Sequence, residues 1–225
     1  IYNEYNKGCE NLSMSYSLEI IKKDIQTLTP RQFYLQHIVR SDNWYFENIL
    51  KYPISEISRI SDDFRMTISE SMGISFNSIM VVGSGKIGYS LSPTEKMFAP
   101  FCVKEDNGRK ISDIDVAIIS SDLYLKFWGL FRKSYSSKYN YTYQNVYKEI
   151  YRGYINEKNI QQVDECRKEW LPISAESKKI LSDKLFIQHE ITYRIYRNWE
   201  DFEEYNLKNI GKLKTKISEA SHGTF

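Results

Sequence analysis

The stretch of sequence that decides the fold reads Ile79-Met80-Val81-Val82-Gly83-Ser84-Gly85-Lys86-Ile87-Gly88. Its first four residues form a short, continuous apolar run, which is typical of a strand buried on both faces. The glycines and Ser84 follow at once, so they predict a tight turn that leads into the start of a helix. A second buried strand is indicated over 114–119, where only Asp115 interrupts the apolar run. Two successive strands thus carry a glycine-rich turn and an acidic pair, Asp113 and Asp115.

Hydrophobic spacing predicts the elements on either side of this unit. They are helices over 13–52 with a break at Pro30, an amphipathic helix over 57–72, a loop over 90–110, a helical stretch over 122–155, a strand over 190–196 and a closing helix over 202–217. This order is typical of an α+β or mixed α/β protein. We therefore expect a small sheet packed on one face by helices. The chain divides into an N-terminal helical segment, 1–52, packed on a core of 53–225 that includes the C-terminal helix.

The composition indicates where the protein is located but does not identify its binding partner. The 225 residues fit a single domain, and 31 basic against 29 acidic residues indicate no strong preference for nucleic acid. The three cysteines are isolated and the three histidines lack zinc-ligand spacing, which is typical of a cytoplasmic protein with reduced thiols. No apolar run approaches the about 18 residues that cross a bilayer, so we expect no membrane partner. The sequence begins with Ile1 rather than Met, and whether a segment precedes it is left open.

The acidic pair is the strongest indication of chemistry. Residues two apart in a strand point to the same face, so the carboxylates of Asp113 and Asp115 project together. Two such charges repel each other by about 1–4 kcal/mol at surface-like dielectrics, and a divalent cation between them relieves that repulsion. Mg²⁺ prefers hard oxygen ligands and commonly binds one or two carboxylates together with substrate phosphates. The Gly83-Ser84 turn offers backbone N–H groups and a hydroxyl to a phosphate. This combination predicts phosphoryl transfer assisted by metal ions.

Two other phosphate motifs compete for the glycine-rich turn. A P-loop requires Gly-Lys-Ser/Thr after its spacer, and here Lys86 falls inside the loop while Tyr89 follows Gly88. The spacing Gly-x-Gly-x-x-Gly does match the dinucleotide fingerprint, so a Rossmann-type oxidoreductase remains an alternative. Its context is unfavourable, because Pro93 interrupts the helix that should follow and the acids stand at the start of the second strand rather than at its end.

The segments Val81-Val82-Gly83-Ser84-Gly85-Lys86-Ile87-Gly88 and Ser112-Asp113-Ile114-Asp115-Val116-Ala117-Ile118 resemble the nucleotidyltransferase-fold superfamily, the group related to DNA polymerase β. The resemblance extends over 79–119. It implies that Gly83 and Ser84 hold the triphosphate of an NTP while Asp113 and Asp115 bind one or two Mg²⁺ ions. It also implies transfer of a nucleoside monophosphate to an acceptor hydroxyl on a protein, a nucleic acid or a small molecule. Bacterial defence or toxin–antitoxin biology, with a protein partner from the same operon, is the setting that this family suggests.

Active members of this superfamily usually carry a third acidic residue on a later strand. The best candidate is Glu190, at the start of the predicted strand 190–196, with Asp164 as a weaker choice. Arg194 shares the face of Glu190 and is predicted to contact phosphate. Lys86 and Gly88 are included among the nucleotide-binding residues, although Lys86 also fits a solvated position in the first helical turn. Without a third acid, the chain would be a non-catalytic nucleotide-binding or antitoxin-like module on the same fold.

Tyrosine is unusually frequent, with 18 copies, and many lie between 135 and 154. Lys133, Lys138, Lys148 and Arg152 lie among them, so stacking on RNA or DNA bases is one interpretation. The tyrosines also recur at helical spacing, which favours the interpretation that they form a packing face. We adopt packing as the prediction.

Overall fold

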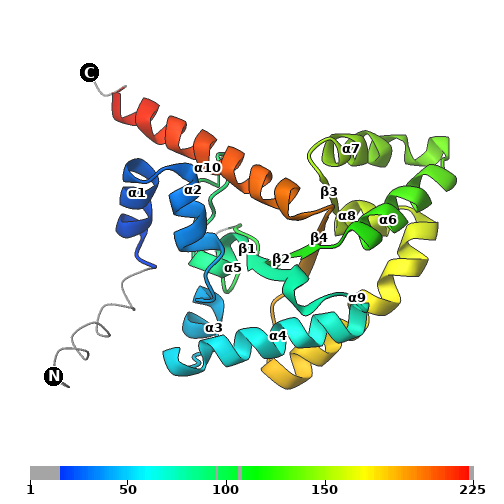
Figure 1. The fold of residues 1–225 in the computed structure, drawn as a ribbon, viewed down its shortest axis with the longest axis horizontal. Helices are drawn as coiled ribbons and strands as arrows, with labels where there is room; N and C mark the ends of the chain where they lie inside the picture. The colour runs from blue at the N-terminus through cyan, green and yellow to red at the C-terminus, as the bar shows by residue number, and fades with distance from the viewer. Residues whose placement is uncertain (1–15, 95, 106–107, 223–225) are drawn as a thin grey trace.

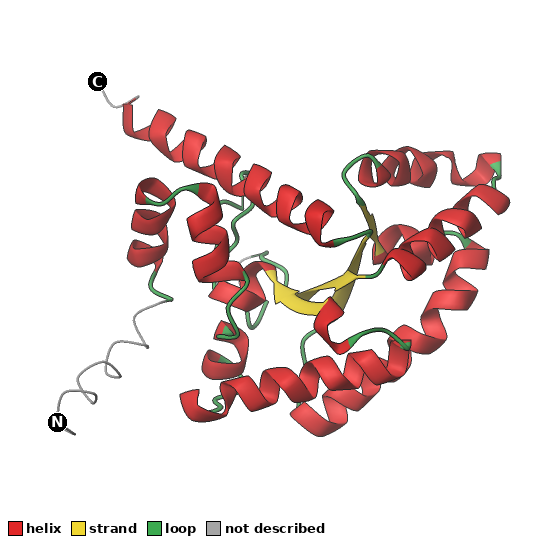
Figure 2. Ribbon diagram, viewed as in Figure 1, coloured by secondary structure: helices red, strands yellow, loops and turns green. Residues whose placement is uncertain are grey.

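The computed structural model describes residues 16–94, 96–105 and 108–222, with a small central sheet surrounded by helices (Figures 1 and 2). The strands are β1 (Ile79–Val82), β2 (Ile114–Ile119), β3 (Tyr154–Asn156) and β4 (Ile191–Tyr196). The α-helices are α1 (Leu18–Thr27), α2 (Pro30–Phe33), α3 (Trp44–Asn48), α4 (Ile57–Met72), α5 (Gly83–Ile87), α6 (Ser121–Lys133), α7 (Asn140–Ile150), α8 (Glu157–Gln162), α9 (Asp164–Leu185) and α10 (Trp199–His222). Shorter helical turns are η3 (Tyr34–Ile38), η4 (Ile54–Glu56), η5 (Phe76–Ser78) and η6 (Ser137–Tyr139). The predicted α+β class is confirmed.

The sheet has the strand order β1-β2-β4-β3. β1 runs antiparallel to β2 and places Val82 opposite Asp115. β2 runs parallel to β4 and places Asp115 opposite Thr192, while β3 pairs with the outer side of β4 in antiparallel fashion. Because a dinucleotide-binding unit joins its first two strands in parallel through a helix, the antiparallel pairing of β1 and β2 contradicts the Rossmann alternative.

Helices cover both faces of the sheet, whereas we expected them on one face only. On one face Ile114, Val116 and Ile118 of β2 pack in a cluster with α4, α6 and α9. On the other face Ala117 and Ile119 pack in a second cluster with α1, α2 and α10. The alternation along β2 explains this, since both sets of its side chains are apolar and need cover. Asp115 belongs by alternation to the face of α10, so the carboxylate lies on that side of the sheet.

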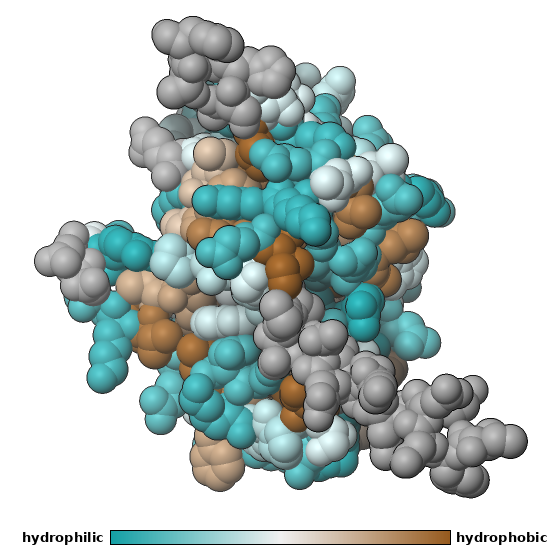
Figure 3. All heavy atoms as spheres, turned by 90° about the vertical axis from the view of Figure 1, so that its left-hand side faces the viewer, coloured by the Kyte–Doolittle hydropathy of each residue, from teal (hydrophilic) through white to brown (hydrophobic). Residues whose placement is uncertain are grey.

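The N-terminal helices are held by specific caps. Thr29 and Gln32 form a capping box at the start of α2, with Pro30 in the first turn, as the predicted break requires. Asn43 caps α3 by accepting from the backbone N–H groups of Tyr45 and Phe46. Figure 3 views the molecule from the side of these helices, where hydrophobic side chains lie in separate patches among hydrophilic ones. No helix in the described part of the chain is long and apolar enough to span a membrane.

The region after β2 differs from the prediction. The predicted helical stretch 122–155 is divided into α6, η6 and α7, and it ends in β3. Gly153 makes that change of direction at φ +77°, a left-handed conformation that favours glycine. The sequence also did not reveal α9, which runs for 22 residues with Pro172 inside it. Of the three cysteines, Cys102 and Cys166 are free and buried, while Cys9 lies outside the described residues.

Candidate functional site

An open cavity of about 1070 Å³ lies on the α10 side of the sheet, where β1 ends and β2 begins. Such a volume is at the upper end for small-molecule sites, which span about 300–1,000 Å³. Its walls come from the loop between α5 and β2, from β4 and from the middle of α10. The lining includes five of the predicted site residues, namely Gly83, Ser84, Asp113, Asp115 and Arg194. In the described part of the chain, the lining does not include Lys86, Gly88 or Glu190.

Gly83 and Asp115 meet closely at the floor of the cavity. Gly83 has φ +66°, and a Cβ atom placed on it would lie 2.6 Å from Oδ2 of Asp115. Both the left-handed backbone and this approach exclude a larger residue. The backbone turn after β1 is therefore fitted against the carboxylate that β2 presents, and Ser84 follows with its hydroxyl at the cavity wall.

The two carboxylates are bridged by a hydroxyl. Thr192 donates to Oδ2 of Asp113 at 3.1 Å, and its Oγ1 also lies 3.4 Å from Oδ1 of Asp115. Burial raises the pKa of Asp115, and the neighbouring charge of Asp113 raises it further. Arg194 and the Thr192 hydroxyl lower that pKa and partly offset the rise. The pair is thus a partly buried site of negative charge that a cation would stabilise.

Arg194 lies beside the pair with its guanidinium held by aromatic rings. It lies over the rings of Tyr154 and Tyr205, at 4.9 and 5.1 Å from their centroids, and donates to the Tyr205 hydroxyl at 2.9 Å. Its Nε is buried and has no hydrogen-bond partner within the described residues. A cation fixed in this way, in the lining of the cavity, can bind an anion there.

The rim of the cavity carries further cations. Lys96, Arg109 and Lys110 come from the loop after α5, and Lys212 comes from α10. Arg109 donates to the Pro100 carbonyl at 2.8 Å, whereas Lys110 and Lys212 make no ion pair within the described residues. With Arg194 the lining holds five cations against the two carboxylates. Such an excess favours a ligand that carries several negative charges.

The loop that we predicted over 90–110 does shape this cavity. Its two arms pair, since Tyr89 and Pro100 form a β-bridge and Ser90 exchanges backbone hydrogen bonds with Phe98 and Ala99. Two hydrogen bonds hold its far end at the start of β2. The Ser112 N–H donates to the Cys102 carbonyl at 2.9 Å, and the Cys102 N–H donates to the Ser112 hydroxyl oxygen at 2.9 Å. The described residues of this loop form one wall of the cavity.

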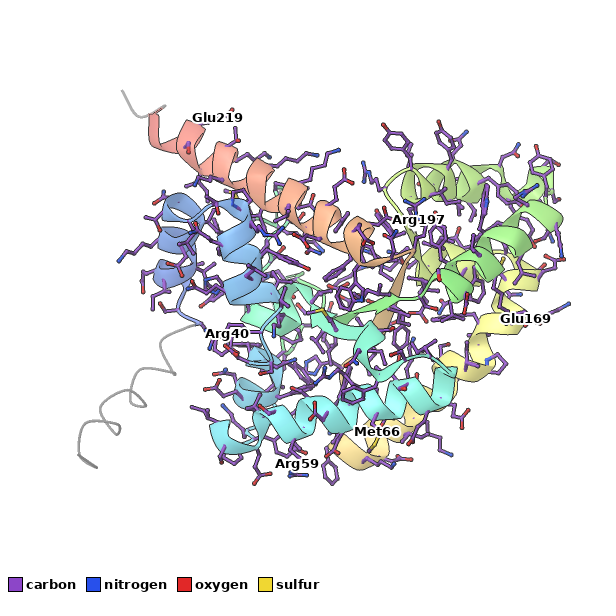
Figure 4. All side chains as sticks on the ribbon, in the orientation of Figure 1. Arg40, Arg59, Met66, Glu169, Arg197 and Glu219 are labelled. Carbon is purple, nitrogen blue, oxygen red and sulfur yellow. The ribbon has the colours of Figure 1, made fainter. Side chains whose placement is uncertain are left out.

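Lys86 and Gly88 have structural surroundings instead. The ammonium of Lys86 is buried and donates to the backbone carbonyls of Arg40 and Asp42, and Figure 4 places Arg40 by the N-terminal helices. Burial lowers the pKa of Lys86 to about 8. Gly88 has φ +86°, and a Cβ atom on it would lie 2.8 Å from the Trp44 ring. Both residues fasten α5 to the η3–α3 segment, so the prediction that they bind nucleotide finds no support in their contacts.

Glu190, the residue predicted as a third acid, is not part of the cavity lining. β4 begins one residue later, and the Glu190 side chain is exposed, while its backbone carbonyl accepts from the Ile114 N–H at 2.7 Å. The position beside the pair belongs to Thr192. Among the described residues, no group of three or more His, Cys, Asp and Glu side chains is placed to hold a metal ion. The donors that fit Mg²⁺ here are the two carboxylates and the Thr192 hydroxyl, all hard oxygens.

Asp164, the weaker candidate, lies elsewhere. It begins α9 and accepts from Lys138 and Tyr139, and these hydrogen bonds lower its pKa to about 2. Thr192 and Tyr205 were not predicted as site residues. The alternation along 190–196 did place Thr192 on the same face as Arg194, so a signal for it existed. No pattern in the sequence indicated Tyr205 as a site residue, because its contact with Arg194 depends on how α10 crosses the sheet.

No family model matches this chain, and neither a curated protein nor a solved structure matches it.

Proposed function

We propose that the chain is a Mg²⁺-dependent nucleotidyltransferase that moves a nucleoside monophosphate from an NTP to an acceptor hydroxyl, with pyrophosphate as the leaving group. The observation that carries the proposal is the meeting of the Gly83-Ser84 turn and the Asp113/Asp115 pair on the floor of one large cavity with a cationic rim. Phosphate and divalent metal are the two ligands that these groups recognise, and an NTP with Mg²⁺ supplies both.

Each group has a role that follows from its surroundings. Asp113, Asp115 and the Thr192 hydroxyl would hold the metal, which when bound offsets the charge of the phosphates and of the carboxylates. Ser84 and the backbone at Gly83 would contact the phosphate tail. Arg194, fixed between Tyr154 and Tyr205, would orient a phosphate without first losing side-chain freedom. Lys110, from the loop, and Lys212, from α10, also line the cavity and would add positive charge for the same anion.

A second candidate is a nucleotide-binding module without turnover. The observation that favours it is Thr192, because a threonine hydroxyl at the position beside the pair is a poor base and adds no negative charge. Glu190, the acid predicted for that role, is exposed and outside the cavity lining. Both candidates require Mg²⁺-dependent NTP binding, and they differ only in whether a bond to phosphorus is broken.

One experiment separates them. The protein is incubated with Mg²⁺ and each common NTP labelled at the α-phosphate, and mass spectrometry records self-modification, acceptor modification, cyclic products and pyrophosphate. Transfer that is lost in Asp113→Ala/Asp115→Ala but kept in the matched surface variant Glu176→Ala/Asp183→Ala supports the transferase. Binding without any product supports the module. Transfer that survives the Asp113→Ala/Asp115→Ala change would overturn the assignment of the pair.

The same assay tests the third carboxylate. Glu190→Gln should keep the rate of transfer, because the side chain is exposed and Thr192 occupies the place next to Asp115. A loss of about a hundredfold or more, the scale of general acid–base catalysis, would instead give Glu190 a direct part in the reaction.

A further inference from the structure

The outer surface of α7 carries tyrosines where the sequence predicted a packing face. Tyr141, Tyr147 and Tyr151 are 75%, 72% and 83% exposed, and Tyr135 in the preceding turn is 71% exposed. Packing involves the opposite side of the helix, where Thr142 and Val146 are buried. The prediction that these tyrosines pack in the core is therefore wrong for four of them, because Val146 and its neighbours already fill the contact with the fold.

The exposed residues over 141–152 form a continuous surface that we call the tyrosine face. Its members are Tyr141, Gln144, Tyr147, Lys148, Tyr151 and Arg152. α7 lies at the periphery of the molecule beyond β3, and side chains project outward from it (Figures 1 and 4). None of the six residues lines the cavity described above, so this surface is separate from the candidate site.

The segment that carries the tyrosine face is positively charged in a chain that is nearly neutral. The segment 132–152, all of which the structure describes, has five cations, Arg132, Lys133, Lys138, Lys148 and Arg152, and a single acid, Glu149, for a net charge of +4. The whole chain has a net charge of only +2. Glu149 is half-buried and accepts from the backbone N–H of Asn156, so it does not oppose the cations at the surface.

Few of these cations are neutralised within the fold. Lys138 pairs with Asp164 at 3.0 Å. Lys133 and Lys148 make no ion pair with any described residue, and both are exposed. Tyr135 stacks on Tyr143 with ring centroids 5.3 Å apart and an angle of 24° between the rings, so it presents a flat aromatic surface beside the turn. Exposed rings and cations without an ion pair among the described residues thus occur together over 132–152.

Two kinds of macromolecule use such surfaces, and their chemistry differs. Protein interfaces are rich in tyrosine but depleted of lysine, and they need partner acids arranged to match each cation. A single-stranded nucleic acid offers regularly spaced phosphates for the cations, and bases whose flat faces stack on aromatic rings. The absence of an exposed acid over 132–152 and the mixture of rings and lysines match the second description. Double-stranded nucleic acid fits less well, because its bases are already stacked on one another.

We propose that the tyrosine face binds single-stranded nucleic acid, with Tyr147 and Tyr151 stacking on bases and Lys148 contacting phosphate. Lys133, at the end of α6 and outside the face as defined, would contact a further phosphate of the same strand. This proposal does not depend on the reaction assigned to the cavity. Binding needs neither Mg²⁺ nor NTP, and it weakens as salt is raised because phosphate contacts release counterions.

The test uses fluorescence anisotropy with labelled oligo-U, oligo-dT and a duplex of equal length, in EDTA so that the cavity cannot contribute through Mg²⁺. Tyr147→Ala/Tyr151→Ala should raise the Kd for the single strands about tenfold or more, which is the scale of stacking on two rings. Tyr147→Phe/Tyr151→Phe keeps the rings and should keep the affinity. Lys133→Glu/Lys148→Glu should weaken binding and reduce its salt dependence. The charge-matched control Lys179→Glu/Lys184→Glu, on exposed positions of α9, should leave the Kd unchanged.

The outcomes are distinct. Binding to oligo-U, to oligo-dT or to both that follows this pattern supports the proposal and identifies the sugar that is preferred. No binding to either strand at low salt overturns the proposal and leaves the face to a protein partner. Binding that the Lys179→Glu/Lys184→Glu control weakens as much as the Lys133→Glu/Lys148→Glu change, or that Tyr147→Ala/Tyr151→Ala leaves intact, also overturns it. Circular dichroism and thermal unfolding of each variant check that its helix content and stability match those of the parent protein, so that a loss of binding is not a loss of folding.

Discussion

Replacing Gly83 by alanine tests the closest contact of the candidate site. The left-handed conformation at φ +66° costs an alanine about 1–2 kcal/mol, partly offset by about 0.4–1 kcal/mol because alanine restricts the unfolded chain. The new Cβ would also lie 2.6 Å from Oδ2 of Asp115, so the carboxylate must move and weaken its contact with Thr192. Overpacking of this kind costs a further ~1–3 kcal/mol. We therefore expect Gly83→Ala to lower the free energy of unfolding by about 2–4 kcal/mol.

Gly73 supplies the matched control. It has φ +63°, nearly the same conformation, but nothing lies within 4 Å of a Cβ placed on it. Gly73→Ala should therefore cost about 1 kcal/mol, which is the backbone contribution alone. The difference between the two variants isolates the overlap with Asp115.

The assay is urea unfolding, followed by circular dichroism at pH 7, of Gly73→Ala, Gly83→Ala, Asp115→Ala and the double variant Gly83→Ala/Asp115→Ala. Once Asp115 is shortened, Gly83→Ala should cost no more than Gly73→Ala, because the overlapping atoms are gone. Equal costs for Gly83→Ala and Gly73→Ala in the parent protein would refute the close approach. So would a cost at Gly83 that does not change when Asp115 is removed.

Three further changes probe the same site. Asp115→Asn should raise the free energy of unfolding at pH 7. The folded state holds the Asp115 proton more tightly than the unfolded state does, so the parent protein loses stability as pH rises from about 4 through the raised pKa, and asparagine removes that loss. Urea unfolding from pH 3 to 8 checks this, and a stability difference between the two proteins that does not grow with pH contradicts it. Thr192→Val deletes the hydroxyl that lies between Asp113 and Asp115 and should lower the free energy of unfolding by about 1.5–3 kcal/mol, because a hydrogen bond to a charged group is lost. Thr192→Ser keeps a hydroxyl and should cost less. Equal losses for the two variants in urea unfolding would show that the hydroxyl does not stabilise the fold. Arg194→Met should raise the Kd for an NTP about tenfold or more, because it removes a charge-assisted contact with phosphate. Isothermal titration calorimetry with Mg²⁺ present measures this Kd. An unchanged Kd would show that Arg194 does not contact the nucleotide.

The elements around the site could be predicted because their signals are local. The apolar runs before Gly83 and after Asp113 are bounded by residues that end a strand, and β1 and β2 have the predicted bounds. The signals for the break at Pro30 and for the end of the helix over 57–72 are likewise local, and both predictions agree with the structure. Alternation over 190–196 placed Arg194 on the face of Glu190, where we predicted a phosphate contact, and Arg194 lines the cavity together with the two carboxylates.

What could not be predicted depends on long-range pairing. The parallel register of β2 and β4 puts Thr192, rather than Glu190, beside Asp115, and no spacing in the sequence reveals that register. β3 has only three residues, too few for a clear alternation, and it was hidden within a predicted helix. The helical spacing of the tyrosines after 135 indicated a periodic face but did not show whether that face meets the core. In the structure the buried side of α7 is that of Val146, and the tyrosines at 141, 147 and 151 lie away from it.

Both functions proposed for the cavity require that the Asp113/Asp115 pair and the Gly83-Ser84 turn together bind an NTP with Mg²⁺. Isothermal titration calorimetry with ATP, GTP, CTP and UTP, in Mg²⁺ and again in EDTA, tests it most directly. We expect at least one NTP to bind in a manner that requires Mg²⁺, that is lost in Asp113→Ala/Asp115→Ala and that is kept in Glu176→Ala/Asp183→Ala. Equal affinity in EDTA, equal affinity in the Asp113→Ala/Asp115→Ala variant, or no binding of any NTP would contradict it.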